Sequence, residues 1–122
     1  MRDTKSEILK FWFEETEPAQ WFQKNSDFDE EIRSRFEPDY TMAVNGIYDG
    51  WMTSDKGCLA LIILLDQFPR NMYRDTPKMF ATDHKALNVA KHAISKNFDQ
   101  MLSIDEKAFL YLPLEHSGEL DD

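Results

Sequence analysis

The sequence is poor in several features, and each shortage excludes a class of protein. Its single cysteine, Cys58, excludes an internal disulfide framework and a cysteine-based zinc site. Only 4 Gly and 5 Pro among 122 residues exclude a collagen-like chain or a linker. The longest apolar run covers eight residues, 58–65, whereas a membrane-spanning helix needs about 20. The absence of a glycine-rich phosphate loop argues against nucleotide hydrolysis by the common route.

Basic residues are also scarce. Lys plus Arg is 14 against 23 for Asp plus Glu, so the formal net charge is −9. An acidic surface repels phosphate backbones and anionic lipid, so neither nucleic acid nor a membrane is an expected partner. No apolar run follows the first basic residues, so no signal peptide is visible and a cytoplasmic location is expected. Nothing in the sequence calls for a cofactor or a metal.

What the chain does have is apolar residues at helical spacing. Hydrophobic residues make up 42% of the sequence and aromatic residues 13%, which is enough for a real core. No segment shows the apolar–polar alternation of a half-buried strand, whereas helix caps recur along the chain. We therefore expect an all-α protein of about six helices, forming one soluble domain over residues 1–122.

Three helices are predicted in the first third of the chain. The first runs from Thr4 to about Glu15 and begins with a capping box in which Thr4 is followed three residues later by Glu7. The second carries apolar residues four apart, at Phe28, Ile32 and Phe36. Pro38 is expected to end it, and a short third helix, 39–45, is expected to stop at Gly46. Trp12 is the expected core anchor, and Trp21 and Phe22 are expected to plug the core.

The apolar run Cys58–Leu65 is the most informative stretch of the sequence. Periodicity alone does not separate a buried strand from a buried helix here. Leu and Ala outnumber the β-branched residues in the run, and every neighbouring segment reads as helical, so we predict a helix. Because it is apolar on all sides, it must be surrounded by other helices. We call it the hub of the fold.

Two further helices are expected after the hub. Thr76-Pro77 predicts the start of a helix that runs to about Lys96. Its inner side is expected to carry Phe80, Leu87, Ala90 and Ile94. Ser103 and Glu106 form a second capping box, and Pro113 is expected to break the last helix. The acidic end, 118–122, is expected to fray.

The polar segment that follows the hub, Asp66–Asn71, is the first candidate site. Pro69 has no N–H for the carbonyl of Leu65, so the helix must kink or stop there and leave acceptors unpaired. Gln67, Arg70 and Asn71 supply donors, and Asp66 can hold the guanidinium in a two-pronged contact. We favour a structural role, a polar plug at a broken helix end. The alternative is a pocket in which Asp66 and Arg70 hold a substrate.

The remaining candidates are acids and histidines further along the chain. Asp83 is interpreted as a partner of Arg70 or Arg74, and alternatively as a second carboxylate beside Asp66. His84 and His92 lie eight residues apart without a third ligand, so they are interpreted as a solvated face. Glu115, His116 and Ser117 are interpreted as local capping groups, since no nucleophile elbow is present. Cys58 is interpreted as an inert core residue.

The order of these motifs resembles the bacterial domain-of-unknown-function family 924. The resemblance rests on Phe11-Trp12-Phe13, Trp21-Phe22, Leu59-Ala60-Leu61, Asp66 to Arg74, Phe80-Ala81-Thr82-Asp83 and Leu112 to Ser117. It implies an all-α bundle of antiparallel hairpins of the tetratricopeptide-repeat-like kind, without an assigned reaction. Family members read Glu-His-Ser-Glu where this chain has Gly118, and they continue through further helices with a second Arg-Phe-Pro motif. The chain resembles the N-terminal part of that fold, truncated at its C-terminus.

Two functions follow as hypotheses. The first is a binding module whose groove takes a peptide or protein partner, basic or apolar because the chain is acidic. A homodimer is also expected, formed by apolar surface that the missing helices leave bare. The second is a small acid–base enzyme of the hydrolase kind, using Asp66, Arg70, Asp83 and His116. No residue is assigned as catalytic. The polar residues expected to bind a ligand or support the fold are Asp66, Gln67, Arg70, Asn71, Arg74, Asp83, Glu115 and His116.

Overall fold

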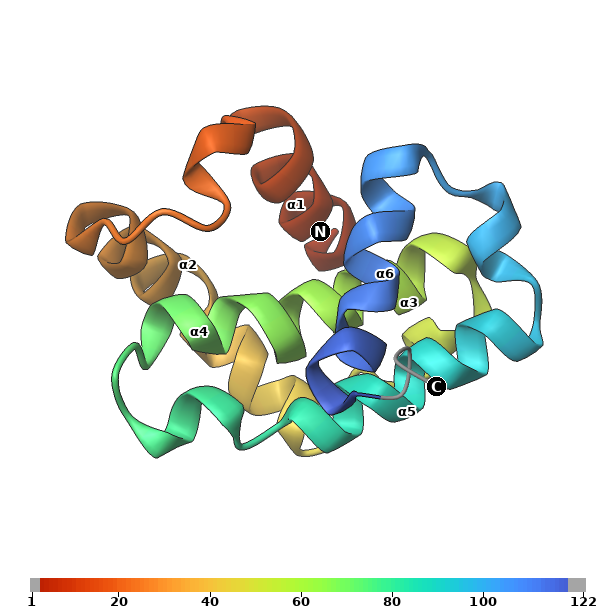
Figure 1. The fold of residues 1–122 in the computed structure, drawn as a ribbon. Coiled ribbons are helices and arrows are strands. Elements are labelled where there is room, and N and C mark those ends of the chain that lie inside the picture. Colours follow the sequence, from red (N-terminus) through yellow and green to blue (C-terminus); the bar gives the residue numbers. More distant parts are fainter. Residues whose placement is uncertain (1–2, 119–122) are drawn as a thin grey trace.

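The computed structural model describes residues 3–118, and within that part the chain consists of helices and turns (Figure 1). This confirms the predicted all-α class; the acidic end beyond Gly118 lies outside the described residues. The α-helices are α1 (Thr4–Lys10), α2 (Ser26–Val44), α3 (Asp55–Ile62), α4 (Phe68–Met72), α5 (Asp83–Ser95) and α6 (Ile104–Ser117). Two π turns, Phe11–Glu15 and Ile63–Gln67, and 3₁₀ turns at Pro18–Gln20, Asp49–Thr53, Pro77–Phe80 and Phe98–Met101 complete the described elements.

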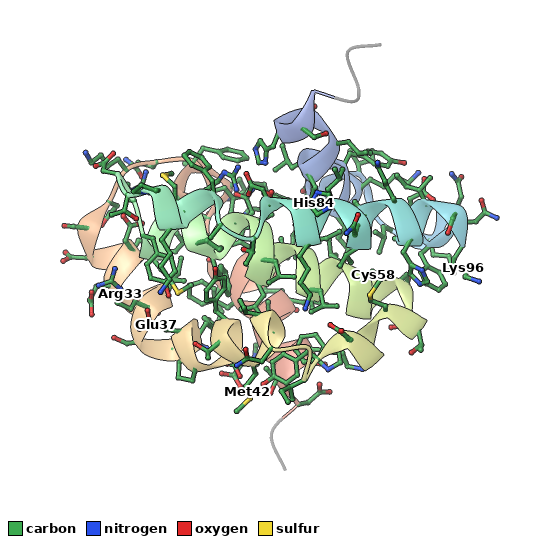
Figure 2. The ribbon with its side chains drawn as sticks, turned by 90° about the horizontal axis from the view of Figure 1, so that it is seen from below. Arg33, Glu37, Met42, Cys58, His84 and Lys96 are labelled. Atoms are coloured by element: carbon green, nitrogen blue, oxygen red, sulfur yellow. The ribbon has the colours of Figure 1, made fainter. Side chains whose placement is uncertain are left out.

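The hub is a single long helix through the centre of the molecule. The π turn Ile63–Gln67 joins α3 to α4 without a break, and α1, α2, α5 and α6 all pack against this helix. Every side chain from Cys58 to Asp66 is 0% exposed, which confirms the predicted buried helix. Figure 2 shows Cys58 inside the fold, whereas Arg33 and Lys96 lie at its edge.

Aromatic rings fill the space between the hub and the N-terminal helices. Trp12 is fully buried, as predicted, and makes edge contacts with Phe68 at 5.8 Å and Phe109 at 5.6 Å. Trp21 is partly buried and donates its indole N–H to the Trp12 carbonyl at 2.8 Å. The prediction for Phe22 is wrong, because its ring is 70% exposed and stacks on Phe109 from outside.

The first helix covers the predicted range, because the π turn Phe11–Glu15 continues α1. Its cap, however, is Asp3 and not Thr4: the Asp3 carboxylate accepts the backbone N–H of Ser6 at 3.3 Å. An acid one residue earlier satisfies the same free donors that a Thr4 capping box would, and it also favours the positive end of the helix dipole.

Prolines 38 and 113 do not end helices as predicted; each lies inside one. Pro38 falls within α2 and Pro113 within α6. A proline inside a helix costs about 3 kcal/mol and removes one hydrogen bond. Phe36 and Tyr40 on either side of Pro38 are buried, as are Pro113 itself and Leu114. Burial beyond each proline therefore outweighs its cost, and the separate helix 39–45 is absorbed into α2. The predicted stop of this segment at Gly46 is confirmed, because Gly46 adopts the left-handed backbone conformation with φ +82°.

The helix predicted from Thr76 to Lys96 is divided. Pro77–Phe80 forms a 3₁₀ turn, and α5 begins only at Asp83. Leu87 is buried as expected, but Phe80 is 55% exposed and lies outside the core. Thr82 lies between the two segments, with its hydroxyl directed toward the hub.

Candidate functional site

The carbonyl that Pro69 leaves without a partner is satisfied by the residue that precedes α5. Where the sequence predicts a kink or a stop, the hub widens into the π turn Ile63–Gln67 and continues. The hydroxyl of Thr82 donates to the Leu65 carbonyl at 2.7 Å, and Tyr40 lies 3.4 Å from the same hydroxyl. Sequence reasoning missed Thr82, because the helix predicted from Thr76 to Lys96 placed this threonine in a helix interior.

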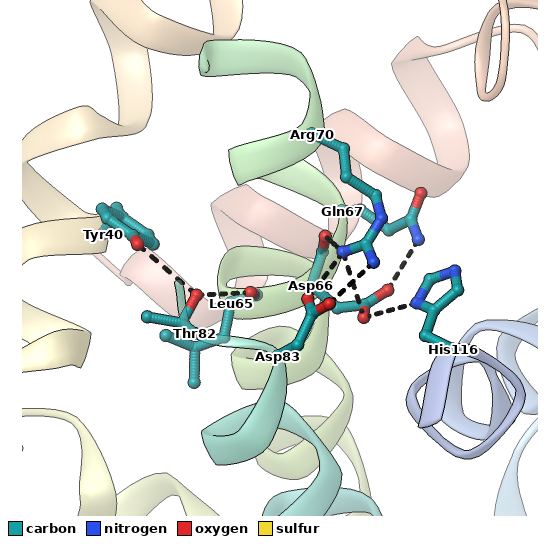
Figure 3. A network of polar contacts seen from close by, with 8 residues as sticks. All are labelled: Tyr40, Leu65, Asp66, Gln67, Arg70, Thr82, Asp83 and His116. Carbon is teal, nitrogen blue, oxygen red and sulfur yellow. Dashed lines mark hydrogen bonds and ion pairs between the residues drawn. The ribbon is translucent and has the colours of Figure 1, made fainter. Parts of the chain in front are cut away.

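Three polar side chains contact the Asp66 carboxylate, two from the residues that follow it and one from α6 (Figure 3). Gln67 donates to Oδ2 at 2.8 Å, His116 Nδ1 lies 2.9 Å from Oδ1, and Arg70 Nη1 lies 3.4 Å from Oδ1. Asp66 is 0% exposed, so its charge depends on these contacts. We name Asp66, Gln67, Arg70, Asp83 and His116 the Asp66 cluster.

Arg70 makes its two-pronged contact with Asp83, and the prediction that Asp66 would hold the fork is wrong. Arg70 Nη1 lies 2.8 Å from Asp83 Oδ1 and Nη2 lies 3.0 Å from Oδ2. Nη1 also donates to the backbone carbonyl of Asp66 at 2.7 Å. Asp83 opens α5, where its carboxylate faces α4, so the predicted partnership of Arg70 with Asp83 is confirmed.

His116 is the second correction, because it is not a local cap. Its contact with Asp66 spans 50 residues and fastens the last turn of α6 to the hub. Its neighbour Ser117 does cap locally, donating to the Leu114 carbonyl at 2.8 Å, while the Glu115 side chain points to solvent. An ionised carboxylate only accepts hydrogen bonds, so Nδ1 carries the proton toward Asp66. Nε2 has no hydrogen-bond partner within residues 3–118.

The rest of the polar segment belongs to a second carboxylate, Asp29 on α2. Asn71 donates to Asp29 Oδ1 at 2.9 Å, and Arg74 holds the same carboxylate through Nε at 2.7 Å and Nη2 at 3.1 Å. The hydrogen bond that Arg74 donates to Asp29 raises the pKa of the guanidinium above its ordinary value. Arg74 therefore does not pair with Asp83. Asp29 was missed because it reads as part of the charged face of an amphipathic helix. We name Asp29, Asn71 and Arg74 the Asp29 cluster.

The remaining candidates carry no chemistry of their own in this fold. His84 is exposed, as predicted, but His92 is half-buried and its Nε2 lies 2.9 Å from the Met52 carbonyl. Cys58 is buried, and burial raises the pKa of its thiol to about 11, which keeps it protonated and unreactive. Among the described residues no group of three His, Cys, Asp or Glu side chains could hold a metal ion.

Two hollows adjoin the Asp66 cluster and share Trp21 and Phe22. The first, which we name the α6 groove, has a volume of about 240 Å³ and runs along the outer face of α6. Its lining includes Ala108, Phe109, Leu112, Asp105 and Glu115. The second, which we name the donor pocket, has a volume of about 180 Å³. It is closed by Gln67, Arg70, Asn71, Arg74 and Met79.

A larger hollow of about 440 Å³ lies between α1, α3 and α6. Three lysines in its lining are balanced by three acids, and one of those pairs is closed, since Lys56 lies 2.6 Å from Glu106. A lining with equal numbers of acidic and basic side chains favours neither a cationic nor an anionic ligand. The α6 groove and the donor pocket have more distinctive linings.

Comparison with known proteins places this arrangement in a family. The family model described as "Bacterial protein of unknown function (DUF924)" matches residues 8–122. The chain belongs to the DUF924 family. The residues of both clusters lie within the matched range, and so do the two hollows.

One solved structure has a fold similar to that of this chain. The protein of unknown function ATU0120 from Agrobacterium tumefaciens is 40% identical to this chain, with a TM-score of 0.88. The likeness covers 92% of this chain and 63% of that one, so this chain spans less than two thirds of its length. None of the curated proteins compared with the sequence matches it. Between residues 3 and 118, no helix combines the length and apolar character needed to cross a membrane.

Proposed function

We propose that this DUF924 protein is a tetratricopeptide-like binding module and that the α6 groove is its partner site. The observation that supports this most strongly is an apolar hollow on the outward face of a helix. Phe22 leaves most of its ring in solvent while stacking on Phe109, and Leu112 is only partly covered. An exposed apolar channel of this kind is where partner helices dock by apolar anchors.

The groove has acidic ends, which favours a basic occupant. Asp105 in the first turn of α6 and Glu115 in its last turns line the hollow on either side of Leu112. The chain as a whole carries a net charge of −9. A segment with an apolar side chain flanked by Lys or Arg complements this pattern, whereas a second copy of the chain would bring another acidic surface. The occupant that we propose is therefore a basic amphipathic helix of a partner protein.

Calorimetric titration with two model peptides tests this proposal. A helical leucine–lysine peptide is expected to bind and its leucine–glutamate counterpart is not. Ala108→Trp, which fills the groove from its exposed wall, is expected to weaken binding at least tenfold. Asn88→Trp, at an exposed position of α5, is the matched control and should leave binding unchanged. Equal binding of both peptides, or equal affinity of the two variants, would overturn the proposal.

The acidic rim provides a second arm of the same test. Asp105→Asn with Glu115→Gln is expected to weaken the leucine–lysine peptide several-fold and to reduce the salt dependence of its affinity. The matched control is Asp27→Asn with Glu30→Gln, which removes the same charges from the first turns of α2. Equilibrium sedimentation completes the set. A stable dimer that Ala108→Trp breaks would contradict the basic partner, because it would make a second copy the occupant.

The acid–base enzyme is a second candidate, supported by the convergence of Asp66, Arg70, Asp83 and His116 in one cluster. Asp66 is fully buried and would not touch a substrate, so the proton would move at Nε2 of His116, with Asp66 positioning the ring. Ester hydrolysis with p-nitrophenyl acetate tests this role. A rate that falls at least tenfold in His116→Gln but not in His84→Gln supports it. Equal rates in the two variants and the wild type would reject it.

A further inference from the structure

The donor pocket has a wall made of hydrogen-bond donors, and this wall comes from one short stretch of the chain. Gln67 ends the π turn, Arg70 and Asn71 belong to α4, and Arg74 follows that helix, and all four side chains line the same hollow. Two of them are guanidinia and two are carboxamides. Trp21, Phe22 and Met79 form the apolar remainder of the lining.

Within residues 3–118 no carboxylate lines this pocket, although the chain holds 23 acidic residues and 14 basic ones. The acids stand behind the wall instead. Asp83 holds the fork of Arg70, and Asp29 holds that of Arg74. Carboxylates in this position fix the orientation of the guanidinium groups and leave their other edges toward the pocket.

Each arginine keeps donors in reserve. Arg70 uses Nη1 and Nη2 in its contacts, and its Nε–H has no partner within residues 3–118. Arg74 uses Nε and Nη2, and its Nη1 has no partner in the same range. A guanidinium has five N–H donors, and neighbouring pairs of them match the two oxygens of a carboxylate.

We propose that the donor pocket binds a carboxylate carried on a small apolar body. The oxygens would face Arg70 and Arg74, and the apolar body would pack against Trp21, Phe22 and Met79. A volume of about 180 Å³ admits a phenyl or branched aliphatic group. Both guanidinia already face a carboxylate, so a singly charged ligand with two planar oxygens fits better than a dianion such as phosphate. The carboxylate belongs either to a free organic acid or to the C-terminus of a peptide.

Titration of the ¹⁵N-labelled protein with 3-phenylpropionate, followed by NMR, tests the proposal. The amide signals of 67–74 and the indole signal of Trp21 are expected to shift, with a dissociation constant on the order of 1 mM. The neutral 3-phenylpropionamide and inorganic phosphate are expected to bind at least tenfold more weakly. Equal shifts with the neutral amide, or shifts that lie outside the pocket, would overturn the proposal.

Two variants and their controls locate the site. Met79→Trp, which fills the pocket, is expected to abolish the shifts, whereas Met101→Trp at a 60% exposed position should not. Arg74→Lys keeps the charge but loses the fork, and should weaken binding at least fivefold; Arg35→Lys on α2 is its control. Unchanged binding in Met79→Trp would place the ligand elsewhere and overturn the assignment. Amide signals of each free variant show directly whether it is folded.

A last arm distinguishes the two sources of the carboxylate. The tripeptide Gly-Gly-Phe with a free C-terminus and its C-terminal amide are titrated beside 3-phenylpropionate. Tighter binding of the free-acid peptide assigns the pocket to peptide C-termini, and tighter binding of 3-phenylpropionate assigns it to small organic acids. Failure of both carboxylates overturns the proposal. Ala108 lines the α6 groove and not the donor pocket, so Ala108→Trp should leave the binding of 3-phenylpropionate unchanged. The carboxylate proposal can therefore fail or succeed independently of the partner proposed for the α6 groove.

Discussion

The Asp66 and Asp29 clusters are built from the same chemistry and differ in depth. Each carboxylate receives one carboxamide and one guanidinium from residues 67–74. Asp66 is 0% exposed, whereas the Asp29 side chain is 14% exposed and Arg74 is 25% exposed. Asp66 also receives His116 from α6. The Asp66 cluster therefore joins the hub, α5 and α6, while the Asp29 cluster joins only α2 and α4.

The depth at which an ion pair lies changes how much the pair contributes to the stability of the fold. When a partly exposed pair breaks, water and salt ions stabilise the separated charges. Such a pair therefore adds little to the stability of the fold. A buried carboxylate has no such alternative, and loss of its donors leaves an uncompensated charge. Loss of the Asp66 carboxylate is therefore expected to cost more stability than loss of the Asp29 carboxylate, because Asp66 is fully buried and Asp29 is partly exposed.

The largest expected effect is on the Asp66 side of the comparison. Asp66→Ala should lower the free energy of unfolding by about 3–5 kcal/mol, because it removes the acceptor that Gln67 and His116 share. Asp29→Ala should cost about 1–2 kcal/mol, since its partners reach water. Urea denaturation of both variants measures the difference. A loss below about 1 kcal/mol for Asp66→Ala, or equal losses for the two, would remove the distinction between the clusters.

A middle-sized effect is expected at the carbonyl that Pro69 leaves free. Thr82→Val keeps the shape but removes the donor to Leu65, so a buried acceptor is left unpaired at a cost of about 1–3 kcal/mol. Thr41→Val is the control: its hydroxyl donates to the Glu37 carbonyl on an exposed face of α2, and its loss should be within about 0.5 kcal/mol. Chemical denaturation of the two variants gives the comparison. Equal stability losses would show that the Leu65 carbonyl needs no donor.

The smallest effect concerns a surface pair outside both clusters, Lys56 and Glu106. Burial alone would raise the pKa of Glu106, but the hydrogen bond from Lys56 and the N–H of Ser103 lower it below its ordinary value of 4.5. The pair therefore stabilises the fold above that pH and loses this contribution as the pH falls through and below it. Lys56→Met should cost about 0.5 kcal/mol at pH 7 and less at pH 3. Thermal unfolding at both values checks this, and a pH-independent difference would contradict it.

Local sequence signals predicted the elements of this fold better than the contacts between them. The run Cys58–Leu65 specified a buried helix, because apolar residues on all sides leave no other place for it. The predictions that Pro38 and Pro113 end helices were wrong. A helix continues through a proline when residues on both sides of it are buried, and that burial depends on residues distant in sequence. Phe22 misled for a similar reason: an aromatic residue beside Trp21 reads as core until the rings already inside leave no room for it.

Most residues of the candidate site were predicted from the sequence, but several of the contacts between them were not. Asp83 was recognised as a partner of Arg70 or Arg74, and the structure shows that the partner is Arg70. The contact of His116 with Asp66 spans 50 residues, and no spacing rule brings them together. Asp29 was indistinguishable from the other acids on its helix. Both of these partners arrive through tertiary packing, which one sequence does not display.

The central claim is that the buried carboxylate of Asp66 fastens α6 to the hub through His116, and a thermodynamic cycle tests it most directly. Asp66→Asn, His116→Gln and the double variant are unfolded in urea. The account predicts a coupling free energy of about 1 kcal/mol or more between the two positions, as for groups in direct contact. Losses that add to within about 0.3 kcal/mol would show that the two side chains act independently and would contradict it.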